Sequence, residues 1–230
     1  MNRKQIFIAV PVLVGRLLNG EEAVRFDHKV RQDFFAGIAG DKEALARGMK
    51  TTEEFLAQNP DHAEALVWHG SGLYSQAGEL FRNGGDQAKG MELFMKGQQE
   101  MDRAVVLAPK SIGVRIPRGA TYLTSTRFMG DAPFVKPLIE KGLADYQAAY
   151  EIQQGYLDKL GAHPLGELLF GLADGNSRVG NETKAKEFFE QIRQRLPESA
   201  YAKRAATWLE TKSLPASQSG CIGCHLSKQQ

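Results

Sequence analysis

The chain has 230 residues, of which 42% are hydrophobic and 24% are charged, an ordinary composition for a globular protein with a sizeable core. Its 29 basic and 27 acidic residues leave a net charge of +2, and no cluster of Lys and Arg with aromatic residues between them occurs. This near balance gives no argument for a nucleic acid or an anionic membrane, so we expect neither as a partner.

The first twenty residues have features of a secretory signal peptide. Arg3 and Lys4 make a basic start, and an apolar run follows from Ile6 to Gly15. The run has the length of a signal-peptide core and is too short to cross a bilayer as a helix. We therefore expect residues 1–20 to be a signal peptide and the protein to be periplasmic or otherwise exported, with no membrane span beyond this segment. No clean cleavage site follows, and a first buried helix is the alternative interpretation.

From about residue 21 to residue 212 the pattern is helical almost throughout, because apolar residues recur every three or four positions and alternating β-branched runs are scarce. Clusters of Gly, Pro, Asn and Asp interrupt the pattern, and such clusters favour helix caps and stops. The predicted breaks lie at residues 39–42, 59–62, 83–86, 108–111, 129–133, 180–182 and 196–199. The sequence therefore predicts an all-α domain over residues 21–212.

Three stretches of this domain share a pattern of large and small residues. In AEALVWHGSGLYSQAG (63–78), the large residues Leu66 and Leu73 flank the small Gly70. The pattern continues at 100–111 and over 166–199, at Ala104, Pro109, Leu169, Leu172, Ala173, Ala185, Phe189 and Pro197. These stretches resemble the tetratricopeptide repeat, a hairpin of two antiparallel helices. The resemblance implies a solenoid of such hairpins over roughly residues 30–212, with grooves that dock other proteins.

The spacing of the prolines departs from a regular repeat. Pro60 and Pro109 are 49 residues apart, and Pro109 and Pro197 are 88 apart. Whole multiples of a repeat of about 34 residues would place them about 34 or 68 residues apart. We therefore expect an irregular solenoid, with longer helices or inserted loops.

After residue 212 the composition changes. The segment SLPASQSG (213–220) has no apolar periodicity and is typical of a flexible linker. The only two cysteines of the chain follow, Cys221 and Cys224, and His225 stands directly after the second. Cys-x-x-Cys-His is the attachment sequence of c-type haem, in which two thiols bond the porphyrin and the histidine binds the iron. The tail (213–230) resembles the c-type cytochromes, which implies one covalent haem c on the two cysteines with His225 as the proximal ligand.

Three other uses of the cysteine pair stay open. A thioredoxin-like redox pair would follow a strand, and no strand is predicted before residue 221. A structural zinc site needs four ligands, so it would need a remote histidine besides the two cysteines and His225. A simple disulfide is the third possibility. In the c-type cytochromes haem is attached outside the cytoplasm, so this resemblance agrees with the signal-peptide interpretation.

The motif does not identify the sixth ligand of the haem iron. Five residues follow His225, too few for the domain of a small cytochrome c. Either the helical domain supplies a distal ligand, or the iron is five-coordinate or takes its ligand from water or a partner. His69 is the main candidate, because it stands where the repeat family buries a large apolar residue, although a hydrogen-bonded histidine between helices is the interpretation we favour. The other candidates, with solvated or core-packing roles as the default, are His28, His62, His163, Met49, Met91, Met95, Met101 and Met129.

The motifs of common hydrolases, zinc proteases and phosphate-binding loops do not occur in the sequence. Arg115 and Arg118, near one predicted helix start, could clamp a partner's carboxylate, but the interpretation we favour is that they are solvated or paired with the chain's own Asp and Glu residues. We expect an exported monohaem electron carrier, not an enzyme, whose helical domain docks a redox partner protein. The alternative is a tetratricopeptide-type binding module in which the cysteine motif serves as a redox disulfide or a metal site.

Overall fold

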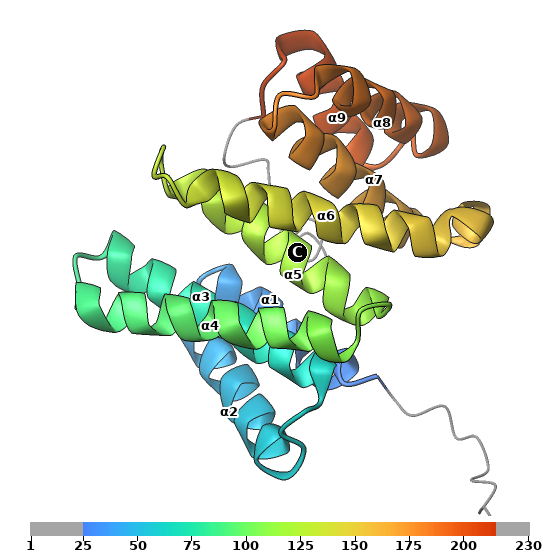
Figure 1. Ribbon diagram of the computed structural model, residues 1–230. Helices are drawn as coiled ribbons and strands as arrows, with labels where there is room; N and C mark the ends of the chain where they lie inside the picture. Colours follow the sequence, from blue (N-terminus) through green and yellow to red (C-terminus); the bar gives the residue numbers. More distant parts are fainter. Residues whose placement is uncertain (1–24, 215–230) are drawn as a thin grey trace, which may run out of the picture.

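The computed structural model describes residues 25–214, which form helices joined by short connections and contain no strand (Figure 1). The α-helices are α1 (Asp27–Ile38), α2 (Lys42–Gln58), α3 (Ala63–Arg82), α4 (Gln87–Leu107), α5 (Ile112–Ser125), α6 (Val135–Gln153), α7 (Ala162–Arg178), α8 (Glu182–Arg195) and α9 (Ala200–Thr211). Two 3-10 helices, η1 (Thr126–Phe128) and η2 (Gln154–Lys159), follow α5 and α6. The all-α prediction is confirmed for this part of the chain.

The helix starts are set by polar side chains that cap the first turn. Asp41, Asp86, Asn181 and Ser199 each accept a hydrogen bond from a backbone N–H in the first turn of α2, α4, α8 and α9. His62 does the same for α3 through its ring Nδ1. All seven predicted breaks fall at helix boundaries. The connection between α6 and α7, which includes η2, was not predicted.

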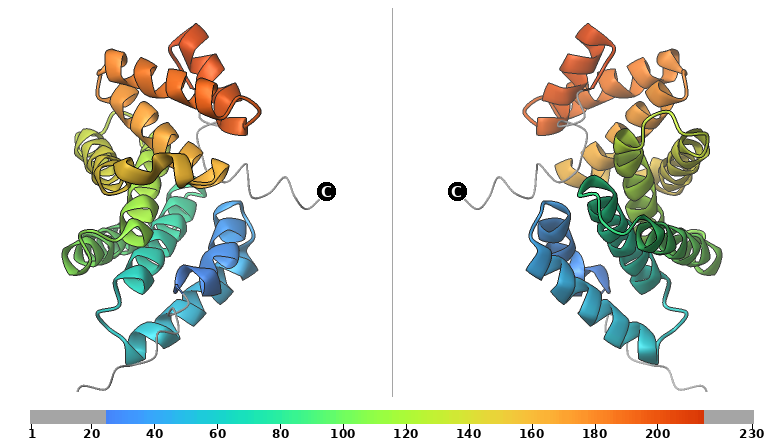
Figure 2. Two further views of the ribbon diagram at one scale, coloured as in Figure 1. Left: turned by 90° about the vertical axis from the view of Figure 1, so that its right-hand side faces the viewer. Right: turned by 90° about the vertical axis from the view of Figure 1, so that its left-hand side faces the viewer.

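Consecutive helices pack as hairpins and the hairpins stack. The contacting pairs are α1 with α2, α3 with α4, α5 with α6, and α7 with α8, and α9 packs on α8. Alternate helices also touch along the stack: α1 with α3, α3 with α5, α5 with α7, and α7 with α9. Figure 2 shows the stack from the side, with α1 and α2 at one end and α8 and α9 at the other. The described part is therefore a linear succession of helix pairs.

The α3–α4 hairpin depends on a close backbone approach at glycine. A Cβ atom on Gly70 would lie 2.7 Å from the carbonyl oxygen of Gly97 and 2.7 Å from the Cγ atom of Met101. Gly70 is the small residue of the repeat pattern, between the buried Leu66 and Leu73. Because no side chain intervenes, the two helices approach closely and the large neighbours pack on either side.

The core consists of three neighbouring clusters that follow the chain. The first is formed mainly by α1 to α5, the second by α5 to α7, and the third by α7 to α9. The pattern residues Leu169, Leu172, Ala173, Ala185 and Phe189 are all buried. Leu214, within the segment expected to be a linker, packs partly buried against the third cluster.

Candidate functional site

The cysteine motif lies outside the described residues. Cys221, Cys224 and His225 belong to the segment 215–230, and the expected signal peptide lies within residues 1–24, so both stay predictions. Within residues 25–214, no group of three or more His, Asp and Glu side chains is placed to hold a metal ion. No helix of this part is long and apolar enough to cross a membrane.

His69 on α3 faces α2 and α4, and only 4% of its surface is exposed. Its ring Nδ1 is 2.5 Å from Glu100 Oε2 on α4, and its Nε2 is 3.4 Å from Glu53 Oε1 on α2. This is the arrangement of the hydrogen-bonded histidine between helices that the sequence favours. A role as distal ligand stays a prediction, and it would require one of these contacts to be given up.

The other candidate ligands are spread over the molecule. His28 is exposed beside Asp27, His62 caps α3, and His163 is exposed at the start of α7, where its Nδ1 is 3.1 Å from the hydroxyl of Tyr201.

The candidate methionine ligands divide into a buried group and an exposed group. Met49 and Met101 are buried in the first core cluster, and Met129 is partly buried against it. Met91 and Met95, each 48% exposed, do not have the core-packing role expected of them.

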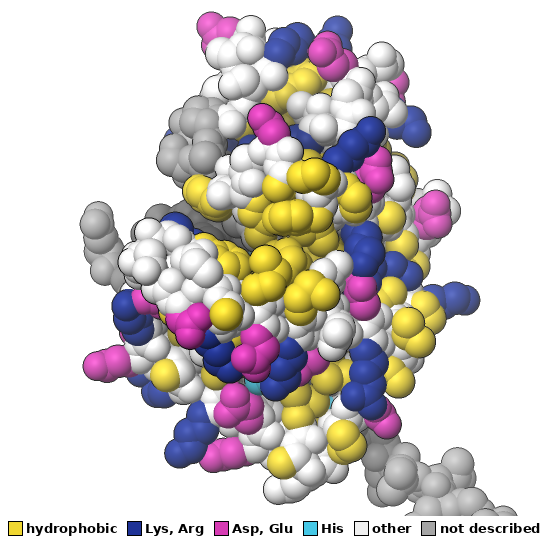
Figure 3. Space-filling view, turned by 60° about the vertical axis from the view of Figure 1, so that its left-hand side comes forward, with side chains coloured by type: hydrophobic (Ala, Val, Ile, Leu, Met, Phe, Trp, Pro, Cys, Tyr) yellow, Lys and Arg dark blue, Asp and Glu magenta, His cyan; other side chains and the backbone are white. Residues whose placement is uncertain are grey.

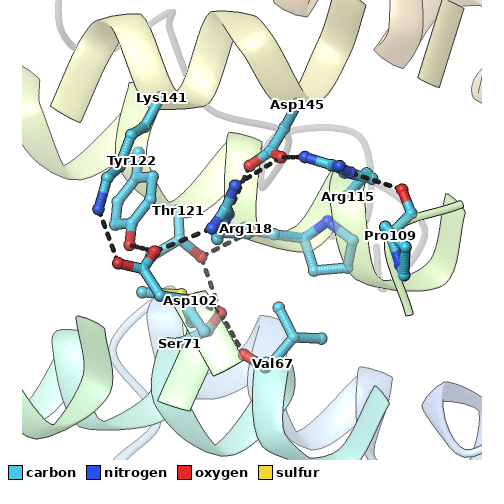
Figure 4. A network of polar contacts seen from close by, with 12 residues as sticks. Val67, Ser71, Asp102, Pro109, Arg115, Arg118, Thr121, Tyr122, Lys141 and Asp145 are labelled. Carbon is cyan, nitrogen blue, oxygen red and sulfur yellow. Dashed lines mark hydrogen bonds and ion pairs between the residues drawn. The ribbon is translucent and has the colours of Figure 1, made fainter. Parts of the chain in front are cut away.

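Arg115 and Arg118 bind carboxylates of this chain. Arg118 donates from Nε and Nη2 to the two oxygens of the fully buried Asp145 on α6, over 2.6 and 2.8 Å. Arg115 donates to Asp145 Oδ1 over 2.7 Å and to the carbonyl of Pro109 over 3.0 Å (Figure 4). Burial lowers the pKa of the Arg118 guanidinium, but the hydrogen bonds and charge of Asp145, with further contributions from Tyr122 and Asp102, together outweigh burial and raise this pKa. Of the two roles favoured from sequence, solvation or pairing within the chain, the structure shows the pairing.

Asp102 on α4 extends this network to a third helix. It accepts hydrogen bonds from Arg118 Nη1 at 2.8 Å, from the hydroxyl of Tyr122 at 3.1 Å and from Lys141 Nζ at 2.6 Å (Figure 4). Two carboxylates therefore face three cations in a network that joins α4, α5 and α6. Such a network fixes how successive hairpins are oriented and leaves its arginines engaged within the chain.

A second buried ionic cluster joins η1 to α7. Asp174 pairs with Arg127, while Arg178 donates to the carbonyl of Leu123 over 2.6 Å and to the hydroxyl of Thr126 over 2.8 Å. Burial raises the pKa of the Asp174 carboxyl, although both arginines oppose this, and burial lowers the pKa of Arg178.

Sequence reasoning missed the acidic members of both clusters. Asp145 stands at a core position of α6, in line with the buried Leu138, Gly142 and Ala149. A single acidic residue in such a stripe, with arginines on the preceding helix, is the signal that could have found it.

Large hydrophobic side chains are exposed on α4 and near the start of α6. Besides Met91 and Met95, Phe128 is 62% and Phe134 47% exposed, and the ring of Phe134 lies 5.9 Å from that of Phe94 on α4. Figure 3 shows a face of the molecule on which hydrophobic side chains gather in the middle. Exposed apolar clusters of this kind are typical of surfaces that meet another protein.

No family model matches this chain, and no match was found among curated proteins or solved structures.

Proposed function

We propose that this protein is an exported monohaem c-type protein that carries electrons, and that its helical domain docks a protein partner. The observation that carries the proposal is the sequence Cys221-Ile-Gly-Cys224-His225. The basic start and apolar run of residues 1–20 support export, which the attachment of haem in c-type cytochromes requires.

The donor set fits a covalently bound haem. The thiols of Cys221 and Cys224 stand three positions apart for two thioether bonds, and the imidazole of His225 follows directly to hold the iron. When bound, the haem supplies a one-electron couple of its iron. The chain's own contribution is to anchor the group through the cysteines and to fix one axial position through the histidine.

We further propose that the helical domain is an irregular tetratricopeptide-like solenoid. The stacked hairpins support this, as do the alternate-helix contacts and the close approach at Gly70. The exposed hydrophobic side chains of α4 and of residues 128–134 supply a surface on which a partner could dock. Partner choice would then reside in the helical domain and electron transfer in the tail.

Haem staining and a difference spectrum test the proposal. The full chain is coexpressed with a haem-maturation system, separated on a denaturing gel and stained for haem peroxidase activity. The purified protein then gives a reduced-minus-oxidised spectrum. We expect a stained band and the spectrum of a c-type haem, because thioether bonds survive denaturation. The C221S/C224S variant should lose both.

A binding module with a redox disulfide or a metal site would behave differently. Exported, intact protein without covalent haem would overturn the haem proposal. Oxidation of Cys221 and Cys224 to a disulfide, or bound zinc that their substitution removes, would then identify which of the two alternatives is correct.

A further inference from the structure

A pocket of about 350 Å³ lies between α6, α7 and α8, and the proposed function makes no use of it. It is formed by the C-terminal half of α6, the second half of α7 and the first half of α8, and α7 packs against both of the other helices. Its volume is within the range of pockets that bind small ligands or single side chains.

The side-chain amide of Asn176 lines this pocket. Asn176 on α7 is 2% exposed, and its Nδ2 donates to the carbonyl of Leu172 over 2.8 Å. Because only the NH₂ group can donate to that carbonyl, the other end of the amide is the oxygen. This oxygen accepts no hydrogen bond from any described residue. The oxygen is not among the fully buried atoms that lack a partner, so it is accessible from the pocket and can accept a hydrogen bond from a donor placed there.

The rim of the pocket carries a net negative charge. The carboxylates of Glu151 on α6 and Glu187 on α8 have no ion pair or hydrogen bond to another described residue, and neither has the side-chain ammonium of Lys184. Glu190, also on α8, is engaged instead in an ion pair with Lys186 at 3.7 Å. Two carboxylates and one ammonium leave one negative charge, which favours a monocation.

Two aromatic rings line the same pocket. Tyr150 and Phe188 meet edge to face, with ring centroids 5.8 Å apart, and both are partly buried. Such rings accommodate an alkyl stem and attract a cation through their faces. The pocket therefore combines an apolar wall, an unpartnered acceptor and an excess of negative charge.

We propose that this pocket binds an ammonium or guanidinium group carried on an alkyl stem. The Asn176 oxygen accepts one of its N–H bonds, Glu151 and Glu187 balance its charge, and the two rings contact its stem. Two sources share this chemistry: a free alkyl amine, and a Lys or Arg side chain of a partner protein. The site is independent of the haem proposal.

The binding test uses the full chain, labelled with ¹⁵N and titrated in an NMR experiment. One probe is n-butylammonium chloride, with n-pentanol as its uncharged counterpart, and the other is a blocked Ala-Lys-Ala peptide. For so small a ligand we expect a dissociation constant on the order of millimolar, weakened by added salt. Amide shifts should be confined to residues near 147–151, 172–176 and 184–188. Binding of the amine alone indicates a free amine as the ligand, and binding of the peptide indicates a partner side chain.

Variants distinguish this site from general attraction to acidic residues. Asn176→Leu should weaken binding at least about tenfold, since it removes a hydrogen bond to a charged group. Because Asn176 is buried, E151Q/E187Q provides a second variant that leaves the core unchanged, and it should weaken binding and flatten its salt dependence. K184M should tighten binding. E190Q on the same helix is the matched control and should bind as the unaltered chain does.

Two results would overturn the proposal. One is the lack of localised shifts with either probe at tens of millimolar. The other is equal weakening of binding by E190Q and by E151Q/E187Q.

Discussion

Tyr74 and Tyr122 lie together in the core between α3 and α5, with ring centroids 5.8 Å apart, yet their hydroxyls differ. The Tyr122 hydroxyl donates to Asp102, whereas the buried Tyr74 hydroxyl has no partner among the described residues. A buried hydroxyl without a hydrogen bond costs free energy, and one bonded to a carboxylate contributes free energy. Tyr74 and Tyr122 therefore allow a buried hydroxyl without a hydrogen bond to be compared with one that has a hydrogen bond.

We expect opposite effects when each hydroxyl is removed. Tyr74→Phe should leave the free energy of unfolding unchanged or raise it by up to about 1 kcal/mol, while Tyr122→Phe should lower it by about 1–2 kcal/mol. Urea denaturation followed by circular dichroism measures both. A larger loss of unfolding free energy in Tyr74→Phe than in Tyr122→Phe would contradict these hydrogen-bond assignments.

The same tyrosines predict how stability depends on alkaline pH. Burial raises the pKa of both phenols above the ordinary value of 10.0. As the pH rises past that value, the unfolded chain loses these protons first, so the folded state binds more protons and the free energy of unfolding falls. The decline should be shallower in Tyr74→Phe and Tyr122→Phe. Tyrosinate absorbance checks the assignment, because both phenols should ionise only on unfolding; ionisation in the folded protein near pH 10 would refute it.

Single residues were only partly predictable from the sequence. The capping side chains could be inferred because a cap acts on its own helix, within three residues. Asp102, Asp145 and Asp174 could not, because the arginines that donate hydrogen bonds to them are 16 to 47 residues away in the chain. For Arg118 the sequence shows a cation near a helix start, and only the stacking of α4 and α6 against α5 supplies its two carboxylates.

At the scale of the helices, α3 depends on the close approach at Gly70. A methyl group added at Gly70 would favour the helix by up to about 1 kcal/mol through helix propensity. It would also clash with the Gly97 carbonyl and Met101, and such overpacking costs about 1–3 kcal/mol. We therefore expect Gly70→Ala to destabilise the protein by about 1–2 kcal/mol, as measured by urea denaturation.

Gly78 on the same helix is the matched control. Its Cβ would meet only the end of the Arg82 side chain, which can move, so Gly78→Ala should be neutral or slightly stabilising through helix propensity. If Gly70→Ala and Gly78→Ala change the free energy of unfolding equally, Gly70 is not required for the close approach of α3 and α4.

Helix boundaries followed from local signals except at one place. Seven breaks carry Gly, Pro, Asn or Asp clusters, and each lies at a helix end. Between α6 and α7, Leu157 and Leu160 pack partly buried against the core, so apolar periodicity continues through the connection and hides it. The pairing of helices into hairpins was suggested by the repeat pattern, whereas the positions of the ionic networks between them depend on tertiary packing.

At the scale of the molecule, the described helices end at Thr211, ten residues before Cys221. We therefore expect C221S/C224S to keep the helical content and urea midpoint of the unaltered chain while it loses covalent haem. A large loss of ellipticity would show instead that the haem or its cysteines support the helical fold.

Haem attachment at Cys221 and Cys224 is tested most directly by the mass of the denatured, exported chain after coexpression with a haem-maturation system. We expect a chain heavier by one haem, with the added mass on the peptide that contains Cys221 and Cys224 and absent from C221S/C224S. An exported chain with no added haem on that peptide would show that these cysteines do not anchor a haem.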